Sequence, residues 1–329
     1  MRAMPWRALA LSAPLLAAPL LLPEYYLAQL AFVCIYVVAG AGLMLLTGYA
    51  GQISLGHAAF VGLGAYTEAI AQARGLPLPL SLCLAGLTAA SGGVIAGLPA
   101  LRLKGIYLAI ATLAAGFIFQ EIFARWDALT GGSAGMAVAP LALFGHRLGE
   151  GGFYYLCLAA AAGAMLGLAN LLHSPTGRAI TAIRDSERTA ASLGVATARY
   201  KTVAFALSAG AAGVAGALYA HKIGFISPEA FDLLLSIELL TMILVGGPGT
   251  LGGVVLGAAF LIAVPQAVIA ARELLPGALA HGSGLQPALF GLALVLTVLF
   301  APEGLAGLGD RLRRGGGAHR RYRKSEAAP

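Results

Sequence analysis

Ten apolar runs follow one another along the chain, and most are close to the length of a membrane-spanning helix. A helix needs about 20 mostly apolar residues to cross a hydrocarbon core of about 30 Å at a rise of about 1.5 Å per residue. The runs lie at 8–22, 27–46, 53–72, 78–98, 106–124, 152–172, 202–220, 233–247, 250–271 and 285–301. The pattern predicts an all-α, polytopic integral membrane protein with about ten transmembrane helices (8–10).

Three of these runs are ambiguous as full crossings. Run 8–22 is short and contains two prolines, and the arginines ahead of it make it similar to a signal peptide. It lacks a clear small-residue cleavage site followed by a polar start, so we expect a helix there. Runs 233–247 and 250–271 are separated only by Gly246, Gly247, Pro248 and Gly249. This stretch is either a tight turn between two crossings or a break within a discontinuous helix.

The composition favours a membrane protein over the other broad classes. Of 329 residues, 59% are hydrophobic and 11% are charged, against about 25% charged in an ordinary soluble domain. This excludes a soluble enzyme, a disordered chain and a coiled coil, because only a bilayer can act as solvent for so much apolar surface. The 45 glycines suit close packing of helices in lipid.

The basic residues predict the orientation of the chain. With both termini in the cytoplasm and ten crossings, 16 Lys and Arg residues lie inside and five outside, as the positive-inside rule requires. Residues 1–309 then form a transmembrane domain with a cytoplasmic loop at 173–201 and a loop on the outer side at 125–151. Residues 310–329 form a basic cytoplasmic tail, which we expect to face anionic lipid rather than nucleic acid.

Motifs for nucleotide, metal or nucleophilic chemistry are missing or misplaced. No lysine follows a glycine, as a GxxxxGK[ST] loop requires, and no histidine precedes a glutamate, as HExxH requires. The three cysteines are far apart in sequence, which predicts neither a disulfide framework nor a CxxC site. Matches to GxSxG at 131–135 and to GxGD at 307–310 fall in a loop and beyond the last apolar run. We therefore expect no enzyme activity, no metal and no cofactor.

A glycine-rich stretch at 47–66 carries polar residues inside an apolar region. Gln52, Ser54 and His57 lie among glycines at 48, 51, 56, 62 and 64. Polar groups at membrane depth are costly and usually face a cavity or a partner helix. The stretch either lines a translocation pathway or forms a packing seam between helices, with His57 satisfied by a neighbouring carbonyl.

The inner loop contains a predicted amphipathic helix. Ser174 and Pro175 provide a start signal and Gly194 a stop signal. The loop also carries Arg178, Ile183, Arg184, Asp185 and Glu187, with Arg184–Glu187 and Asp185–Arg188 spaced to form ion pairs. A small apolar face with mixed charges fits a groove on a protein partner better than it fits lipid headgroups.

Three isolated acids, Glu68, Glu121 and Glu238, lie in the apolar runs. Glu68 and Glu121 fall near helix ends, where a structural role is the simpler interpretation. Glu238 is deeper, and it is the best candidate for the essential carboxylate that a proton-driven secondary carrier would need.

Several of these stretches match one known family in order. TGYAGQISLGHAAFVGLGAY (47–66) resembles the signature of the LivM-type permease subunit of branched-chain amino acid ABC importers. So do LRLKGIYLAIATLA (101–114), LTGGSAGM (129–136), SPTGRAITAIRDSERTAASLGV (174–195), AFALSAGAAGVAGALYA (204–220) and GGPGTLGG (246–253). The resemblance covers roughly residues 27–303.

The resemblance implies an ABC importer permease fold in the bacterial inner membrane. It implies a second homologous permease subunit, two ATP-binding subunits and a periplasmic substrate-binding protein as partners. The 174–195 helix would be the coupling element on the ATPase. Glu187 and Gly194 fit the superfamily's Glu-Ala-Ala and later Gly pattern, whereas Arg188 departs from it. The substrate would be leucine, isoleucine, valine or a related molecule, with urea, amides and aromatic acids as alternatives within the class.

Overall fold

The computed structural model describes residues 6–100, 103, 105–143, 146–272, 291, 295, 299 and 304–307. The predicted run 285–301 is described at three positions only, and the basic tail 310–329 lies outside the described residues. The chain divides into two compact units, residues 1–240 and 241–329. Each unit is described by itself.

The structure is all-α apart from four two-residue strands, as predicted. The helices are α1 (Trp6–Leu21), α2 (Glu24–Leu43), η1 (Met44–Tyr49), α3 (His57–Ala73), α4 (Leu78–Ala100), α5 (Ile106–Arg125), α6 (Asp127–Thr130), η2 (Gly132–Ala134), α7 (Glu150–His173), α8 (Pro175–Asp185), α9 (Glu187–Ser192), α10 (Thr197–Ile223), η3 (Pro228–Phe231), α11 (Leu233–Gly246) and α12 (Leu251–Arg272). The strands are β1 (Met136–Ala137), β2 (Ala142–Leu143), β3 (His146–Arg147) and β4 (Phe225–Ile226).

Among the described residues, five helices are long and apolar enough to cross a membrane. They are Glu24–Tyr49, Leu78–Leu98, Ile106–Arg125, Glu150–His173 and Thr197–Ile223. Helix α1 forms where run 8–22 predicts a helix, but it has only 16 residues. Helix α11 is also short, with 14 residues. These lengths do not establish ten crossings.

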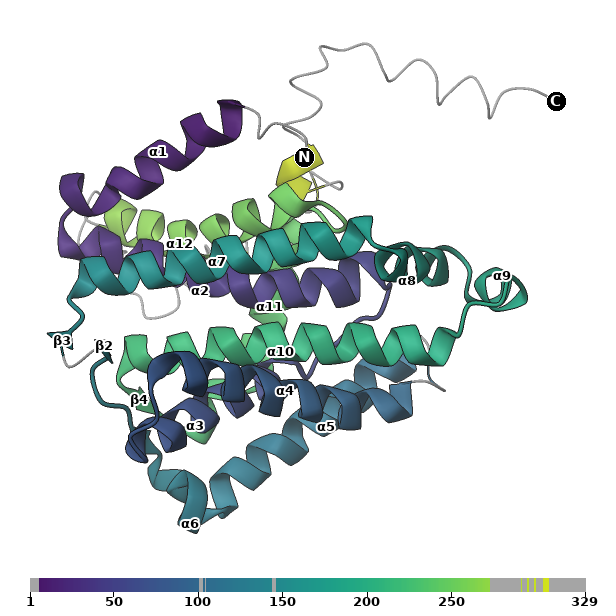
Figure 1. Ribbon diagram of the computed structural model, residues 1–329, viewed down its shortest axis with the longest axis horizontal. Coiled ribbons are helices and arrows are strands. Elements are labelled where there is room, and N and C mark those ends of the chain that lie inside the picture. The colour runs from purple at the N-terminus through teal and green to yellow at the C-terminus, as the bar shows by residue number, and fades with distance from the viewer. Residues whose placement is uncertain are drawn as a thin grey trace. The chain divides into compact units, whose positions relative to one another are not determined.

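Helix α10 lies at the centre of unit 1 and packs against α2, α3 and α4, while α7 packs on α2 (Figure 1). Small residues make the close contacts. A Cβ on Gly213 of α10 would lie 2.5 Å from the carbonyl oxygen of Ala85 in α4, and one on Gly64 of α3 would overlap the Gly213 backbone. Such glycine contacts let helix backbones approach where lipid supplies no hydrophobic drive for association.

The loop at 125–151 contains only short helices and strands, and it contacts the rest of unit 1 through a strand pair. Strand β1 pairs antiparallel with β4, which follows α10, and β2 pairs with β3 in a hairpin. Helix α6 ends at Thr130 with Gly131 as its C-cap, and η2 follows, with positive φ at Gly131, Gly132 and Gly135. These elements close the end of the bundle opposite α8 and α9 (Figure 1).

Unit 2 contains the last part of α11 and all of α12. A Cβ on Gly246 would overlap the carbonyl of Gly253, and one on Gly257 would overlap the carbonyl of Met242. The two helices therefore pack backbone to backbone around the turn that joins them.

Candidate functional site: the inner segment and its cavity

The predicted start of the third apolar run is wrong, because residues 50–56 are not helical. Helix α2 continues as the π-helix η1 to Tyr49, the chain then extends, and α3 begins at His57. Gly51 has a φ of 66°, a conformation that glycine adopts without steric cost. The interruption predicted between runs 27–46 and 53–72 therefore lies a few residues further along the chain.

Side chains from other helices accept hydrogen bonds from backbone N–H groups that have no helical partner at the break. The Leu55 N–H donates to Thr112 Oγ1 of α5 at 3.0 Å, and the Ala58 N–H donates to Ser236 Oγ of α11 at 2.9 Å. Free N–H groups at the start of a helix need such acceptors where water is excluded. The break is thus a built feature of the fold.

The three polar residues of the stretch are all buried. Gln52 is 4% exposed, and Ser54 and His57 are fully buried. Their polar side-chain atoms have no hydrogen-bond partner within the described part of the chain. His57 lies beside the Ala39 backbone and makes an edge-to-face contact with Phe60 at 5.9 Å. Gln52 lies beside a cavity at the inner segment.

The predicted inner helix is two helices with a break at Ser186. Helix α8 begins at Pro175 after the N-cap Ser174, whose Oγ accepts the Gly177 N–H at 3.2 Å. Ser186 is extended (φ −160°, ψ 106°) and caps α9 by accepting the Thr189 N–H at 3.3 Å. Ser186 is thus a second N-cap. Gly194, with a φ of 83°, follows the end of α9.

The break also changes the predicted ion pairs. The extended Ser186 removes the helical spacing on which the predicted Arg184–Glu187 and Asp185–Arg188 pairs depend. Glu187 Oε1 instead lies 2.6 Å from Lys201 Nζ at the start of α10. The Lys201 side chain is 6% exposed and that of Glu187 is 22% exposed. This pair ties α9 to the central helix of unit 1.

The apolar face of α8 packs on the protein itself. Ile180 and Ile183 are 1% and 6% exposed, and α8 contacts α7, α10 and η1. A Cβ on Gly177 would overlap the Leu171 carbonyl at the end of α7. Ile183, expected among the partner-contacting residues, is therefore an internal anchor.

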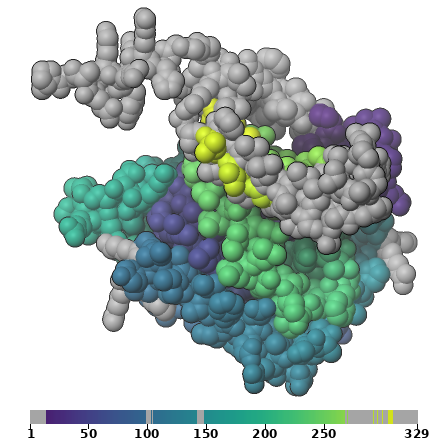
Figure 2. Space-filling model, turned by 180° about the vertical axis from the view of Figure 1, so that it is seen from behind, coloured from purple at the N-terminus to yellow at the C-terminus, as the bar shows by residue number. Residues whose placement is uncertain are grey.

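The outward surface of α8 and α9 consists mainly of polar side chains and one leucine. Arg178, Arg184 and Asp185 are exposed, as is Gly194. Leu193 is 78% exposed at the end of α9. The segment stands out from the end of the bundle (Figures 1 and 2). Leu193 was missed as a candidate because the helical pattern placed it on the same face as the buried Ala190.

A cavity of about 270 Å³ lies between the inner segment and the α3 break. Its lining combines residues 50–52, the start of α5, the end of α8 and the Glu187–Lys201 pair. The cavity therefore joins the break, the inner segment and the central helix.

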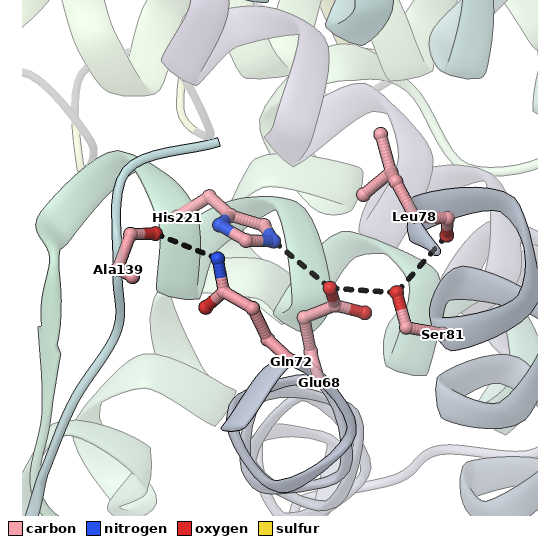
Figure 3. A network of polar contacts seen from close by, with 6 residues as sticks. All are labelled: Glu68, Gln72, Leu78, Ser81, Ala139 and His221. Carbon is pink, nitrogen blue, oxygen red and sulfur yellow. Dashed lines mark hydrogen bonds and ion pairs between the residues drawn. The ribbon is translucent and has the colours of Figure 1, made fainter. Parts of the chain in front are cut away.

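At the opposite end of the bundle, Glu68 is part of a buried polar network (Figure 3). Glu68 Oε1 lies 2.9 Å from His221 Nε2 of α10 and 2.8 Å from the Ser81 hydroxyl of α4. The side chains of Glu68 and His221 are each 1% exposed. Nearby, Gln72 donates to the Ala139 carbonyl at 2.9 Å. The network joins α3, α4 and α10, which favours a structural role for Glu68.

The other two acids have different surroundings. Glu121 pairs with Arg125 on an exposed face of α5. Glu238, on α11, is partly buried and lies within electrostatic range of the Tyr36 and Tyr219 phenols. No cluster of three or more His, Cys, Asp or Glu side chains that could hold a metal ion occurs in the described ranges.

The glycines at 246–249 lie where α11 ends and α12 begins. Helix α11 ends at Gly246, and Gly247 and Gly249 have φ angles of 117° and 80°. Both angles favour glycine over other residues.

Comparison with known proteins assigns the chain to a family. The model of the branched-chain amino acid transport system permease component matches residues 25–301. The chain belongs to this family. Among these permeases, LivM of Salmonella typhimurium and LivM of Escherichia coli, each a high-affinity branched-chain amino acid transport permease, are 33% identical over 297 residues. Both alignments cover 82% of this chain and 67% of the relative.

A second type of relative is named for the import of a different molecule. LsrC of Enterobacter sp., an autoinducer 2 import permease, is 28% identical over 253 residues, covering 73% of this chain and 69% of the relative. No solved structure matches this permease significantly. Membership of the family makes the chain a multi-pass membrane protein and a transport subunit.

Proposed function

We propose that this chain is the permease subunit of an ATP-driven importer for branched-chain amino acids, moved by partner ATPases through α8 and α9. The observation that supports this proposal most is how the inner segment is attached to the bundle. It projects from the bundle, yet it is held to α7 and α10 by the buried Ile180 and Ile183 and by the Glu187–Lys201 pair. A force applied to its outer surface would therefore reach the spanning helices.

The partner surface is the exposed side of this segment. Arg178, Arg184 and Asp185 offer charges to a protein groove, and Leu193 offers an apolar contact beside Gly194. A central apolar anchor within a polar rim is the usual arrangement at protein interfaces. Glu187 holds the segment to α10, because it pairs with Lys201.

The assembly we propose has two ATP-binding subunits, a second homologous permease and a periplasmic binding protein. The count of basic residues supports ten crossings with both termini, and hence α8 and α9, in the cytoplasm of a bacterial inner membrane. The chain itself hydrolyses no ATP in this account. We propose that Gln52, Ser54 and His57 contact the substrate along the translocation pathway, and that the glycine turn at 246–249 is a helix break.

The substrate class rests on the family and on the LivM relatives. The similarity to LsrC makes import of another small molecule the second candidate. A proton-driven carrier using Glu238 is the competing mechanism.

The test is uptake of radiolabelled L-leucine into proteoliposomes that contain the complete importer, with binding protein outside and ATP inside. We expect leucine uptake to require ATP and both permeases. Excess valine or isoleucine, bound to the binding protein in place of leucine, should abolish the uptake. The matched control is an importer with hydrolysis-deficient ATP-binding subunits, given a proton gradient.

Uptake in that control at the rate of the intact importer would contradict the ATP-driven mechanism. Loss of uptake in a Glu238→Gln importer, with ATP hydrolysis unchanged, would favour the carrier instead. ATP-dependent uptake of urea or autoinducer 2 in place of leucine would overturn the substrate class alone.

A further inference from the structure

Helix α11 begins beside the middle of the spanning helix α5 rather than beside its end. A hollow of about 10 Å³ is lined by residues between Leu113 and Gln120 of α5, and by Leu233 and Ser236 of α11. These α5 residues lie roughly 10 to 21 Å from its start at 1.5 Å per residue, and α5 is long enough to cross a membrane. The first turn of α11 therefore lies at membrane depth.

The segment that leads into α11 brings irregular backbone to the same depth. Between α10 and α11 the regular elements are β4 and the short helix η3. Gln120 Nε2 of α5 lies 3.5 Å from the Pro228 carbonyl oxygen, and a Cβ on Gly62 of α3 would lie 2.9 Å from Phe231 Cγ. Irregular backbone at membrane depth is tolerated only where it is buried in protein or lines an aqueous cavity. Packing on α3 and α5 covers part of this segment, and the charge at its end indicates what faces the rest.

The segment ends in a carboxylate with no cation beside it. Asp232 lines the hollow and is partly exposed. Its Oδ1 accepts the Leu235 N–H at 3.1 Å, as an N-cap does, and none of the ion pairs in the described part of the chain includes it. Glu238, further along α11, is a second acid within electrostatic range. Acids at membrane depth are costly and usually face water or line a substrate pathway.

The rest of the hollow is mainly apolar and reaches the surface of the bundle. Leu55, Leu113, Phe117 and Leu233 contribute to the lining, and Phe117 is 51% exposed. The volume is about that of one water molecule, so a larger molecule passes only if the helices move apart. Apolar side chains beside one carboxylate suit a substrate that carries an ammonium group and an apolar side chain.

We propose that this face of α5, η3 and the start of α11 lines the translocation pathway, and that the Asp232 carboxylate attracts the ammonium group of the substrate. The proposal rests on the proposed function for the identity of the substrate. Gly56 also lines the hollow, and it joins this face to Ser54 and His57 on either side of it in the chain. The second permease would form the opposite wall.

The experiment measures whether water reaches this face in the complete importer. Phe117→Cys is made in a Cys83→Ser permease, because Cys83 is exposed whereas Cys34 and Cys157 are buried. Proteoliposomes that turn over ATP with loaded binding protein receive a trimethylammonium methanethiosulfonate on both sides, and mass spectrometry follows the labelling. Thiolates in water react, whereas a thiol in apolar surroundings stays protonated and inert. We expect Phe117→Cys to react about tenfold or more faster than the control.

The matched control is Ile118→Cys, at the next residue of α5. Ile118 is 60% exposed but does not line the hollow, so it should face lipid and react slowly. Leu113→Cys tests a second position on the wall and should react like Phe117→Cys. Slow labelling at both wall positions would show that a dry contact covers this face. That result, or labelling of Ile118→Cys at the same rate as Phe117→Cys, would overturn the inference.

Asp232→Asn tests the carboxylate separately from the fold. Asn is as good an N-cap as Asp, so this variant keeps the start of α11 and removes the charge. The labelling rate of Phe117→Cys with the cationic reagent is divided by its rate with an anionic sulfonate reagent of the same class. We expect Asp232→Asn to lower this ratio about threefold or more, and leucine uptake to fall with it.

The control for the charge is Glu229→Gln, because Glu229 is an exposed acid of η3 that does not line the hollow. It should change the ratio less than Asp232→Asn does. An unchanged ratio in Asp232→Asn would overturn the role of Asp232.

The labelling result does not depend on what the importer carries. If the wild-type importer fails to take up leucine, the proposed function is contradicted, while faster labelling of Phe117→Cys than of Ile118→Cys still supports an aqueous pathway at this face. Leucine uptake without that difference overturns the inference alone.

Discussion

At the scale of single residues, burial separates acids that look alike in sequence. Glu68 and Glu121 both occur near the ends of apolar runs, and no pattern in the chain distinguishes them. The structure buries Glu68 with His221 and Ser81, whereas Glu121 and Arg125 are 58% and 80% exposed. Exposed pairs contribute little to stability, but a buried donor left without its acceptor is costly.

This difference predicts unequal effects of the same substitution. Glu68→Ala leaves His221 and Ser81 without their shared acceptor, so we expect a loss of about 2 kcal/mol or more. Glu121→Ala is the control and should cost less than about 1 kcal/mol. Thermal unfolding of the two variants in detergent measures the difference, and equal melting temperatures would show that the network in Figure 3 does not stabilise the fold.

At the scale of elements, hydropathy predicted the helices better than their interruptions. The long helices α2, α4, α5, α7 and α10 form where the apolar runs lie, because length and apolarity determine them. The gap between runs 27–46 and 53–72 predicted an interruption at 47–52, and the structure places it at 50–56, because η1 continues to Tyr49 and α3 begins only at His57. The break at Ser186 was missed because a regular charge spacing suggested one helix, although a serine before Glu187 is itself an N-cap signal.

The candidate site was predictable only in part. The sequence located the inner segment and its capping residues, because these are local signals. It did not reveal that Ile183 is buried, that Glu187 pairs with Lys201, or that Gly51 lies against Arg184 of α8, because these contacts join residues far apart in the chain.

Helix packing in unit 1 gives a prediction at the same scale. Gly213 lies where α10 meets α4, and a Cβ there would be 2.5 Å from the Ala85 carbonyl. Gly213→Val should force the two helices apart and reduce the yield of folded permease several-fold. Gly163→Val is the control, because nothing lies within 4 Å of a Cβ at Gly163 on α7. Size-exclusion chromatography of the two variants measures the yield of folded permease. A wild-type profile for Gly213→Val would contradict the close packing of α10 on α4.

At the scale of the whole molecule, the chain is a membrane transport subunit, and we propose that its inner segment transmits movement from the partner ATPases. The family establishes the class. The described helices include five clear spanning candidates, and the proposed ten crossings depend on the short helices and on residues beyond those described. The sequence of the permease contains no nucleotide-binding loop of the GxxxxGK[ST] type. In this proposal the partner ATPases, docked on α8 and α9, supply that loop.

The most direct test of this account is a single change at the tip of the inner segment. Leu193 is 78% exposed and contributes nothing to the core, so Leu193→Asp should leave the permease folded while weakening its contact with the ATP-binding subunits about tenfold or more. The control is Arg199→Asp, because Arg199 is exposed near the start of α10 and lies outside the spanning core, where a charge would be costly. The measurement is the amount of ATP-binding subunit that co-purifies with the permease, together with leucine uptake. The account predicts that Leu193→Asp loses both and Arg199→Asp keeps both; full retention of both by Leu193→Asp would contradict it.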